Sequence, residues 1–395
     1  MTHLSSEVGN KQLGSKSRPR AVKLTVSRRQ RSTPYTPRIE EHGVSDYSIV
    51  NRTILPKGFG KSVDEDYWHL RTHVQLWDVS CQRQIELRGP DAARLVQLMT
   101  PRDLRRAKVG QCFYAPLVDA KGGMINDPII LKHADDHYWL SIADSDVTLW
   151  AKGLAQGYGF DLAIREADVN VLAVQGPKSD DLMSKVFGDV VRSIRFFRFK
   201  TLDFRGHPLV VARSGYSKQG GFELYLDNWS LGLPLWDALW EAGIEFNVSP
   251  GSPNLIERVE GGLLSLGNEM TNENNPLECG LGKYCQLDGS LEFIGRDALM
   301  RINEEGPKQM IRGVLFGGDR CPPCRAPWPL HVDGRVVGSV TTAIWSPRFE
   351  KNVSLGMLKR GYWQPGQQVK VESSDGQFRP GVVVELPFPD VADIT

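Results

Sequence analysis

The sequence lacks any apolar run that approaches the roughly 20 residues of a membrane-spanning helix, and its first residues lack the apolar segment of a secretory signal. It also lacks an excess of one charge, because 48 Lys and Arg stand against 47 Asp and Glu, for a net charge of +1. Proteins that bind nucleic acid or membranes over a whole surface carry a strong charge bias. We therefore expect a cytoplasmic protein that binds neither.

Cysteine is scarce, with six residues in a chain of 395. That number requires no disulfide framework in a protein of this length, and it is typical of a reducing compartment. Only Cys321 and Cys324 have the spacing of a metal or redox pair. No second pair of similar spacing accompanies them and prolines surround them, so we expect neither a zinc site nor a redox motif there.

Motifs for nucleotides and metal ions are incomplete. Gly60-Lys61-Ser62 resembles the end of a phosphate-binding loop, but Leu55 stands where the first glycine of that loop must be. His69 and His73 lie four residues apart in a segment that we expect to be helical, yet no third ligand accompanies them. We expect no metal site in this protein.

Charge is unevenly distributed along the chain. Residues 1–32 contain eight Lys or Arg and a single acid, Glu7, which leaves 40 basic and 46 acidic residues in the other 363. We expect this basic arm to be a disordered extension in solvent, and we assign it no function.

The order of apolar runs predicts the domain organisation. Leu87-Arg-Gly-Pro-Asp91 and Val174-Gln-Gly-Pro-Lys178 echo each other, because each ends an apolar run at Gly-Pro before a helical pattern begins. Beyond about residue 308, strand-like runs alternate with turns such as Asp333-Gly334 and Asp375-Gly376, which favour tight hairpins. We therefore predict two related α+β halves followed by an all-β domain.

Individual elements follow from the same patterns. The strands that we expect are 112–118, 128–132, 138–142, 209–213 and 222–226. The spacing of Ile256, Val259 and Leu263 predicts a helix after Asn254.

The segment from Arg213 to Tyr225, RSGYSKQGGFELY, holds the strongest local pattern. Alternation along its second strand sends Glu223 and Tyr225 to one face and Phe222 and Leu224 to the other. A carboxylate on such a face can accept two hydrogen bonds from the edge of an amino-pyrimidine ring. The same pattern also fits a glutamate on a half-exposed sheet, and spacing alone leaves both readings open.

A set of motifs resembles a known family, the glycine cleavage T-proteins (aminomethyltransferases). The motifs follow the order of that family: Gly122-Gly-Met-Ile-Asn-Asp127, the 215–223 loop, Arg258-Val-Glu-Gly-Gly262, Gly267-Asn-Glu and Asn275-Pro-Leu-Glu278. The resemblance runs from about residue 26 to the C-terminus. It implies an α+β fold in which two related, ferredoxin-like domains and a C-terminal β barrel or jelly roll form a three-domain cloverleaf around tetrahydrofolate.

The resemblance also implies where the domains lie. We expect the first α+β domain over 33–84 and 168–248, the second over 85–167 and 249–307, and the β domain over 308–395.

Within that family the chain resembles the dimethylsulfoniopropionate (DMSP) demethylases. The runs that carry this likeness are VSDYSIV (44–50), EDYWHL (65–70), WDVSCQRQ (77–84), VQLMT (96–100) and NLIERVE (254–260). The resemblance implies a methyltransferase that transfers a methyl group from DMSP to N5 of tetrahydrofolate, and that yields methylmercaptopropionate and 5-methyltetrahydrofolate. Its partners would be folate and a small sulfonium compound, with a homodimer as a possible assembly.

The resemblance also assigns the folate site. Glu223 matches the family carboxylate that holds the pterin ring. Asp127 matches the aspartate near the folate nitrogens, and we expect it to take up the proton that N5 loses. Tyr114, Tyr216 and Arg258 are the other folate contacts that we expect.

The second substrate is assigned on the same basis. Tyr225 is expected beside the reacting centre as a catalytic residue, in addition to Asp127. An aromatic face suits a sulfonium and an arginine suits a carboxylate. The expected contacts of the methyl donor are Tyr216, Tyr225, Ser141, Arg38, Tyr47 and Trp77.

Two positions depart from the family pattern. Asn254 stands where the T-proteins have an arginine for the folate tail, and Tyr216 stands where DMSP demethylases usually have a tryptophan, which has a stronger π face. Two alternatives stay open: a methyltransferase that uses another sulfonium, an N-methyl or an O-methyl donor, and a folate-binding protein without turnover. The 213–223 loop lacks the cysteine of the iron–sulfur maintenance relatives, which disfavours the second alternative.

Overall fold

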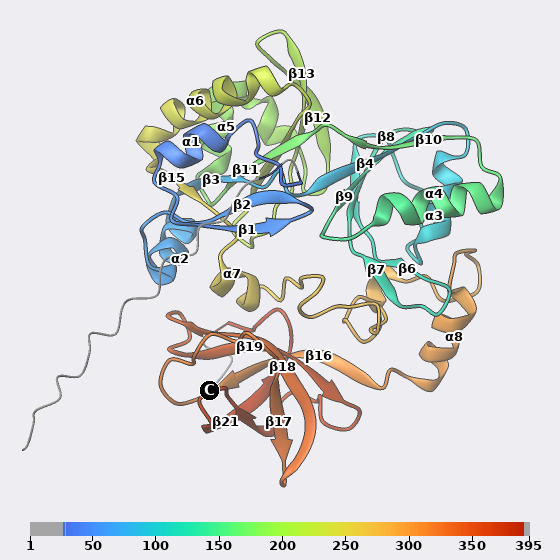
Figure 1. The fold of residues 1–395 in the computed structure, drawn as a ribbon, viewed down its shortest axis with the longest axis vertical. Helices are drawn as coiled ribbons and strands as arrows, with labels where there is room; N and C mark the ends of the chain where they lie inside the picture. The colour runs from blue at the N-terminus through green and yellow to red at the C-terminus, as the bar shows by residue number, and fades with distance from the viewer. Residues whose placement is uncertain (1–26, 28, 391–395) are drawn as a thin grey trace, which may run out of the picture.

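The computed structural model describes residues 27 and 29–390. Two sheets with their helices fill the upper part of Figure 1, and a β barrel lies below them. The basic arm expected over 1–32 falls mostly outside the described residues, which leave out 1–26 and 28. Within the described ranges, no helix has the length and apolar character that crossing a membrane requires.

The first sheet has six strands in the order β12-β13-β14-β11-β3-β15, and only the pair β15 and β3 is parallel. Its strands are β3 (Val74–Asp78), β11 (Asn170–Gln175), β12 (Phe199–Phe204), β13 (His207–Ala212), β14 (Gly221–Leu226) and β15 (Val248–Gly251). Its helices are α1 (Thr36–Glu41), α5 (Ser179–Phe187) and α6 (Gly232–Gly243). Leu76, Val174 and Leu224 are among the strand residues that form one buried cluster with these helices.

The second sheet has five antiparallel strands in the order β10-β4-β9-β8-β5. Its strands are β4 (Arg83–Arg88), β5 (Gln111–Tyr114), β8 (Ile129–Ala134), β9 (His137–Ile142) and β10 (Ala163–Ala167). Helices α3 (Ala92–Met99) and α4 (Val147–Tyr158) pack against it, with Leu87 and Leu140 in the shared core.

The echo between the two halves is confirmed in the structure. β4 runs into α3, and β11 runs into α5, each through Gly-Pro. Gly89 and Gly176 have φ of 148° and 125°, a region that glycine enters without strain. A Cβ on Gly89 would lie 2.7 Å from the Leu162 Cα, and one on Gly176 would lie 2.3 Å from the His73 carbonyl oxygen. Both turns therefore require glycine for conformation and for space.

The C-terminal domain is a closed barrel in the strand order β16-β19-β18-β17-β20-β21. Its strands are β16 (Gln309–Phe316), β17 (Trp328–Val332), β18 (Arg335–Ser346), β19 (Lys351–Lys359), β20 (Gln368–Glu372) and β21 (Phe378–Val384). Asp333 and Gly334, with φ of 48° and 76°, form the two-residue turn between β17 and β18. The predicted fold class, two related α+β parts and a β barrel, is confirmed; the exact domain boundaries stay a prediction.

The remaining elements connect these parts. They are β1 (Asp46–Val50), β2 (Thr53–Gly58), α2 (Val63–Thr72), β6 (Leu117–Val118), β7 (Met124–Asn126), α7 (Leu255–Glu260), α8 (Arg296–Glu305) and single turns of 3-10 helix at Asp189–Ser193, Trp229–Leu231, Ile244–Phe246 and Gly282–Tyr284.

Two predicted elements differ in extent. The strand expected over 112–118 is split into β5 and β6, because Pro116 lies between them and has no N–H for a ladder. The helix expected through Leu263 ends at Glu260, because two glycines follow and Gly262 has φ of 60°.

Candidate active site

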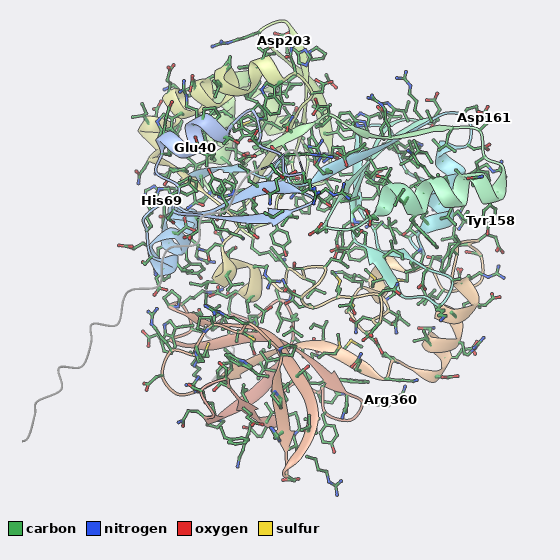
Figure 2. All side chains as sticks on the ribbon, in the orientation of Figure 1. Glu40, His69, Tyr158, Asp161, Asp203 and Arg360 are labelled. Carbon is green, nitrogen blue, oxygen red and sulfur yellow. The ribbon has the colours of Figure 1, made fainter. Side chains whose placement is uncertain are left out.

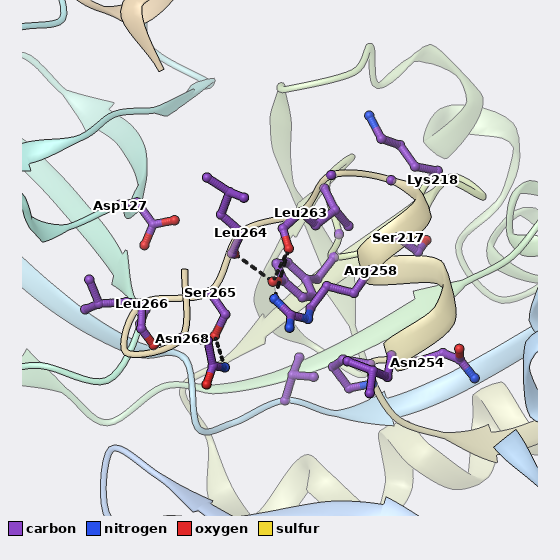
Figure 3. Close-up of a pocket in the computed structure, with 18 of the residues that line it drawn as sticks. Asp127, Ser217, Lys218, Asn254, Arg258, Leu263, Leu264, Ser265, Leu266 and Asn268 are labelled. Atoms are coloured by element: carbon purple, nitrogen blue, oxygen red, sulfur yellow. Dashed lines mark hydrogen bonds between the residues drawn. The ribbon is translucent and has the colours of Figure 1, made fainter. Parts of the chain in front are cut away.

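A cavity of about 1030 Å³ lies between the two sheets, helix α7 and one end of the barrel. Its walls come from β1 and β2, from the ends of β5 and β7, from the loop before β14, and from segments 252–268 and 385–387. Figure 3 shows part of this wall, with Asp127 on one side and Lys218 on the other. Residues that are far apart in the sequence thus line one cavity.

Glu223 lies on the face of β14 opposite to the helices, because Phe222 and Leu224 occupy the helix-covered face. The Ser214 hydroxyl donates to Glu223 Oε2, and the Tyr225 hydroxyl donates to the same oxygen at 3.3 Å. Glu223 is buried, and burial raises its pKa above the usual range, against the opposing effect of these donors. The alternative of a half-exposed surface glutamate is therefore wrong.

Tyr225 is not among the residues that line the cavity. Its ring is buried between the two sheets in a cluster with Trp139, and burial raises the pKa of its hydroxyl well above the usual value. Because that hydroxyl donates to Glu223, the structure supports a role for Tyr225 in orienting the carboxylate. Its expected catalytic contact with the substrate stays a prediction.

Asp127 and Tyr114 form the second polar pair of the cavity. The Tyr114 hydroxyl donates to Asp127 Oδ2 at 2.8 Å. Burial raises the pKa of Asp127 to about 7, and the hydrogen bond from Tyr114 opposes that rise. A carboxyl group with this pKa exchanges its proton near neutral pH. We call the part of the cavity lined by Glu223, Asp127, Ser214 and Tyr114 the acidic end.

Ser141, on β9, also lines the cavity, beside Gln84 of β4 and Gln82, which directly precedes that strand. Gln84 Nε2 donates to Ser141 Oγ at 2.9 Å, and Ser141 Oγ donates to Gln82 Oε1 at 3.5 Å. Gln82 itself lines the cavity. A polar network therefore continues from the second sheet toward the acidic end.

Helix α7 brings Arg258 into the cavity wall. Arg258 Nη1 donates to Glu269 Oε2 at 2.6 Å, and Nη2 donates to Thr342 Oγ1 of the barrel at 3.0 Å. Both charged groups are buried, so the guanidinium is compensated within the protein. Tyr216 faces the same wall, where its hydroxyl donates to the Leu264 carbonyl at 2.7 Å. Arg258 and Tyr216 line the cavity with polar groups that are already hydrogen-bonded.

The other end of the cavity, around the start of α7, is lined by two lysines, Lys61 and Lys218, and by Asp66. Lys218 N donates to Glu257 Oε1 of α7 at 2.9 Å, and Lys61 Nζ donates to Ser249 Oγ at 2.6 Å. The side chain of Asn254 is engaged, since its Oδ1 caps α7 and its Nδ2 donates to Asp66 Oδ2 at 2.8 Å. We call the part of the cavity lined by Lys61 and Lys218 the lysine end.

Three expected contacts of the methyl donor lie outside the cavity. Arg38, on α1, is paired with Asp237 through Nε at 2.6 Å and Nη2 at 2.8 Å. Trp77 is buried between the sheets and donates to a glutamine oxygen two residues earlier at 2.7 Å. Tyr47 packs against the core of the first sheet. None of these three side chains is part of the cavity wall, and Arg38 and Trp77 are already hydrogen-bonded within the fold, so their contacts with the methyl donor stay predictions that the cavity does not support.

Other sequence candidates have structural roles. Ser62 caps helix α2 in a reciprocal arrangement with Glu65. Burial raises the pKa of Cys321 and of Cys324 to about 11, which keeps both thiols protonated. Within the described ranges, no group of three His, Cys, Asp or Glu side chains is placed to hold a metal ion.

Sequence analysis missed several residues of the cavity wall. They are Gln82, Ser214, Lys218, Lys61, Phe196 and Phe197. Ser214 and Lys218 belong to the 213–225 segment, so that loop was the signal that could have found them. Phe196 and Phe197 lie in an irregular connection where no periodic pattern marks a face, and only the three-dimensional path of the chain reveals them.

The arrangement suits an elongated ligand with hydrogen-bond donors at one tip and carboxylates at the other. Buried carboxylates at the acidic end can accept charge-assisted hydrogen bonds, and ammonium groups at the lysine end can pair with anions. A cavity of about 1030 Å³ also leaves room for a second, small molecule beside such a ligand.

Comparisons with known proteins match most of the chain. The model of the GCVT N-terminal domain matches residues 24–289, and the model of the glycine cleavage T-protein C-terminal barrel domain matches residues 311–390. The chain is 53% identical over 359 residues to the dimethylsulfoniopropionate demethylase of Ruegeria pomeroyi, which covers 91% of this chain and 97% of that protein.

More distant relatives share the same architecture. An aminomethyltransferase of Symbiobacterium thermophilum is 35% identical over 339 residues, covering 83% of this chain and 89% of that protein. The crystal structure of the glycine cleavage system aminomethyltransferase T from Bartonella henselae superposes with a TM-score of 0.81 at 23% identity, over 91% of this chain and 98% of that one. The latter likeness concerns the fold alone.

Proposed function

This chain belongs to the glycine cleavage T-protein family, and we propose that it works as a tetrahydrofolate-dependent methyltransferase of the DMSP demethylase type. The reaction transfers a methyl group from dimethylsulfoniopropionate to N5 of tetrahydrofolate. Its products are methylmercaptopropionate and 5-methyltetrahydrofolate.

The polarity of the cavity is the observation that carries the proposal. Reduced folate has an amino-pyrimidine edge at one tip and carboxylates at the other. The acidic end, with Glu223 and Asp127, fits the first tip. The lysine end, with Lys61 and Lys218, fits the carboxylate tip. These lysines serve in place of the arginine that T-proteins have at the position of Asn254.

Glu223 holds the pterin edge in this proposal. The Ser214 and Tyr225 hydroxyls fix its carboxylate by hydrogen bonds to Oε2. Binding of the ligand therefore costs Glu223 no further rotamer freedom. Tetrahydrofolate supplies N5 as the nucleophile. Tyr114, Tyr216 and Arg258 complete the wall around the folate.

The methyl donor needs position more than activation, because a sulfonium loses its methyl group and departs as a neutral thioether. The protein must hold the methyl–sulfur bond in line with the attacking nitrogen at near-attack distance. Ser141 lies on the wall near the acidic end, where its hydroxyl can contact the methyl donor.

Asp127 accepts the proton that N5 loses on methylation, directly or through water. Its pKa of about 7 is matched to this task at neutral pH. Tyr114, which donates to Asp127, holds the carboxylate in place.

We further propose a cytoplasmic protein whose partners are folate and a small sulfonium compound, without nucleic acid or membrane partners. A homodimer is the assembly to test.

A panel of methyl donors tests the proposal. Purified protein and tetrahydrofolate are mixed anaerobically with DMSP, other sulfonium compounds, and N-methyl and O-methyl compounds, and 5-methyltetrahydrofolate is measured by mass. We expect product with DMSP at a rate typical of enzymes. Product with another donor alone would reassign the substrate, and folate binding without any product would support a non-catalytic protein.

A further inference from the structure

Two phenylalanines that have no role in the proposed function line the cavity. Phe196 and Phe197 lie in the connection between the 3-10 turn at Asp189–Ser193 and β12, and both line the cavity. Their rings meet edge to face, with centroids 4.5 Å apart and planes at 66°. Phe196 is 72% exposed, the largest exposed fraction of any large apolar side chain in the described residues. Two adjacent aromatic rings on the wall of a cavity can contact a ligand.

The backbone at Phe197 is strained. Its φ is 56°, a left-handed conformation that bulky side chains rarely adopt. Three hydrogen bonds impose it: Phe197 N donates to the Arg213 carbonyl, and Cys112 N and Arg198 Nη1 donate to the Phe197 carbonyl, each at 3.0 Å. Strain that is held by the surrounding structure and borders a cavity is typical of functional positions.

These hydrogen bonds place the pair at the acidic end. Arg213 directly precedes Ser214, the donor to Glu223, and Cys112 lies two residues before Tyr114, the donor to Asp127. Phe197 also packs against the cluster that contains Tyr225. Hydrogen bonds thus join the Phe197 backbone to the two segments that carry the hydroxyl donors of Glu223 and Asp127, and both rings line the same cavity as these carboxylates.

The chemistry of the wall fits a cation. The faces of aromatic rings attract positive charge, and the carboxylates Glu223 and Asp127 add to that attraction. Among the aromatic residues expected to contact the methyl donor, Tyr47, Trp77 and Tyr225 lie outside the cavity, whereas Tyr216 lines it with a hydroxyl that donates to the Leu264 carbonyl. We propose that Phe196 and Phe197 bind the sulfonium group of the methyl donor by cation–π contact and make the site selective for small onium compounds. This proposal rests on the proposed function and names two substrate-binding residues for it.

Two inhibitors of the same shape test the proposal. N,N-dimethyl-β-alanine carries a cation in place of the sulfonium, and 4-methylpentanoate carries a neutral carbon there. The inhibition constant of each is measured against DMSP at saturating tetrahydrofolate. The ratio of the two constants reports the preference for positive charge and is independent of shape.

The variants are Phe196→Leu and Phe197→Leu, which keep an apolar side chain and remove the π face, with Phe59→Leu as a control on another part of the cavity wall. We expect the cation preference of the wild type to fall about 2- to 30-fold in the first two variants and to persist in the control. Phe196 is exposed, so its variant keeps the folded core.

Two results would overturn the proposal. An unchanged ratio in both variants would show that the rings carry no charge preference. A raised KM for tetrahydrofolate with an unchanged ratio would assign the rings to the folate instead. Failure of the proposed function is a separate result, because it would show in the wild type as the absence of 5-methyltetrahydrofolate from DMSP.

Discussion

The two ends of the cavity differ in how their charged groups are held. At the acidic end, Glu223 is buried and receives hydrogen bonds from Ser214 and Tyr225, and Asp127 receives one from Tyr114. At the lysine end, the ammonium groups sit on long side chains near the surface. Fixed carboxylates can position a reacting ring to a fraction of an ångström, whereas flexible ammonium groups add affinity by charge. The comparison separates a reacting end from an anchoring end.

The largest effect that distinguishes the two ends should come from the loss of Glu223. Glu223→Ala removes a buried carboxylate that we expect to accept two charge-assisted hydrogen bonds from folate, so folate affinity should fall by at least about 100-fold. Calorimetric titration with tetrahydrofolate measures the loss, and circular dichroism verifies the fold. The exposed Glu273 supplies the matched control, Glu273→Ala. Wild-type affinity in the Glu223 variant would refute the assignment of the acidic end.

Asp127 tests whether the acidic end also performs chemistry. Its carboxylate is the active form, and its pKa is about 7, so kcat/KM should rise with pH through about 7 and level off above it. Asp127→Asn should lower kcat about 100-fold or more and remove that limb. A pH–rate profile of both proteins checks the prediction. An Asp127→Asn variant with the wild-type limb would exclude Asp127 as the group that titrates.

A change at Tyr114 also tests whether Asp127 is the group that titrates. The hydrogen bond from its hydroxyl lowers the pKa of Asp127, so Tyr114→Phe should move the limb to higher pH while the ring stays in place. The pH–rate profile reports the direction of the shift. A limb that moved to lower pH would contradict the role given to this hydrogen bond.

The lysine end should respond more weakly. Lys218→Ala should raise KM for tetrahydrofolate about 2- to 5-fold, as expected for one charge pair near the surface, and leave kcat unchanged. Added salt should reduce the difference between variant and wild type, because salt screens such pairs. Steady-state kinetics at two ionic strengths tests this. A fall in kcat without a change in KM would erase the distinction between the two ends.

Arg38 supplies the smallest expected effect. Because it pairs with Asp237 outside the cavity, Arg38→Ala should leave KM for DMSP unchanged and cost about 1 kcal/mol or less of stability. Kinetics and thermal unfolding measure the two effects. A large rise in KM for DMSP would restore Arg38 as a substrate contact.

Much of the fold was predictable because short-range chemistry decides it. The Gly-Pro turns before α3 and α5 and the Asp333-Gly334 hairpin depend on backbone conformations that few residues adopt. The alternation along β14 also placed Glu223 on the face away from the helices. Element ends were harder to predict, because Leu263 fits the helical spacing although the two preceding glycines end α7.

The site was predictable only in part, because it depends on contacts between distant segments. Nothing in the pattern around Arg38 indicates that Asp237, on another helix, occupies its guanidinium. The alternation that turns Glu223 toward the cavity also places Tyr225 on the same face, yet packing against the second sheet buries the tyrosine. Phe197 is held at the cavity by backbone hydrogen bonds to Cys112 of β5 and to Arg213 just after β13, which no local pattern encodes.

One measurement tests the central claim most directly. Wild-type protein is mixed anaerobically with tetrahydrofolate and DMSP whose S-methyl groups carry deuterium, and the folate and thioether products are analysed by mass after a single turnover. We predict 5-methyltetrahydrofolate that retains all three deuterons of the methyl group, with an equal amount of methylmercaptopropionate. Folate that stays bound but unlabelled, with DMSP unchanged, would contradict the account.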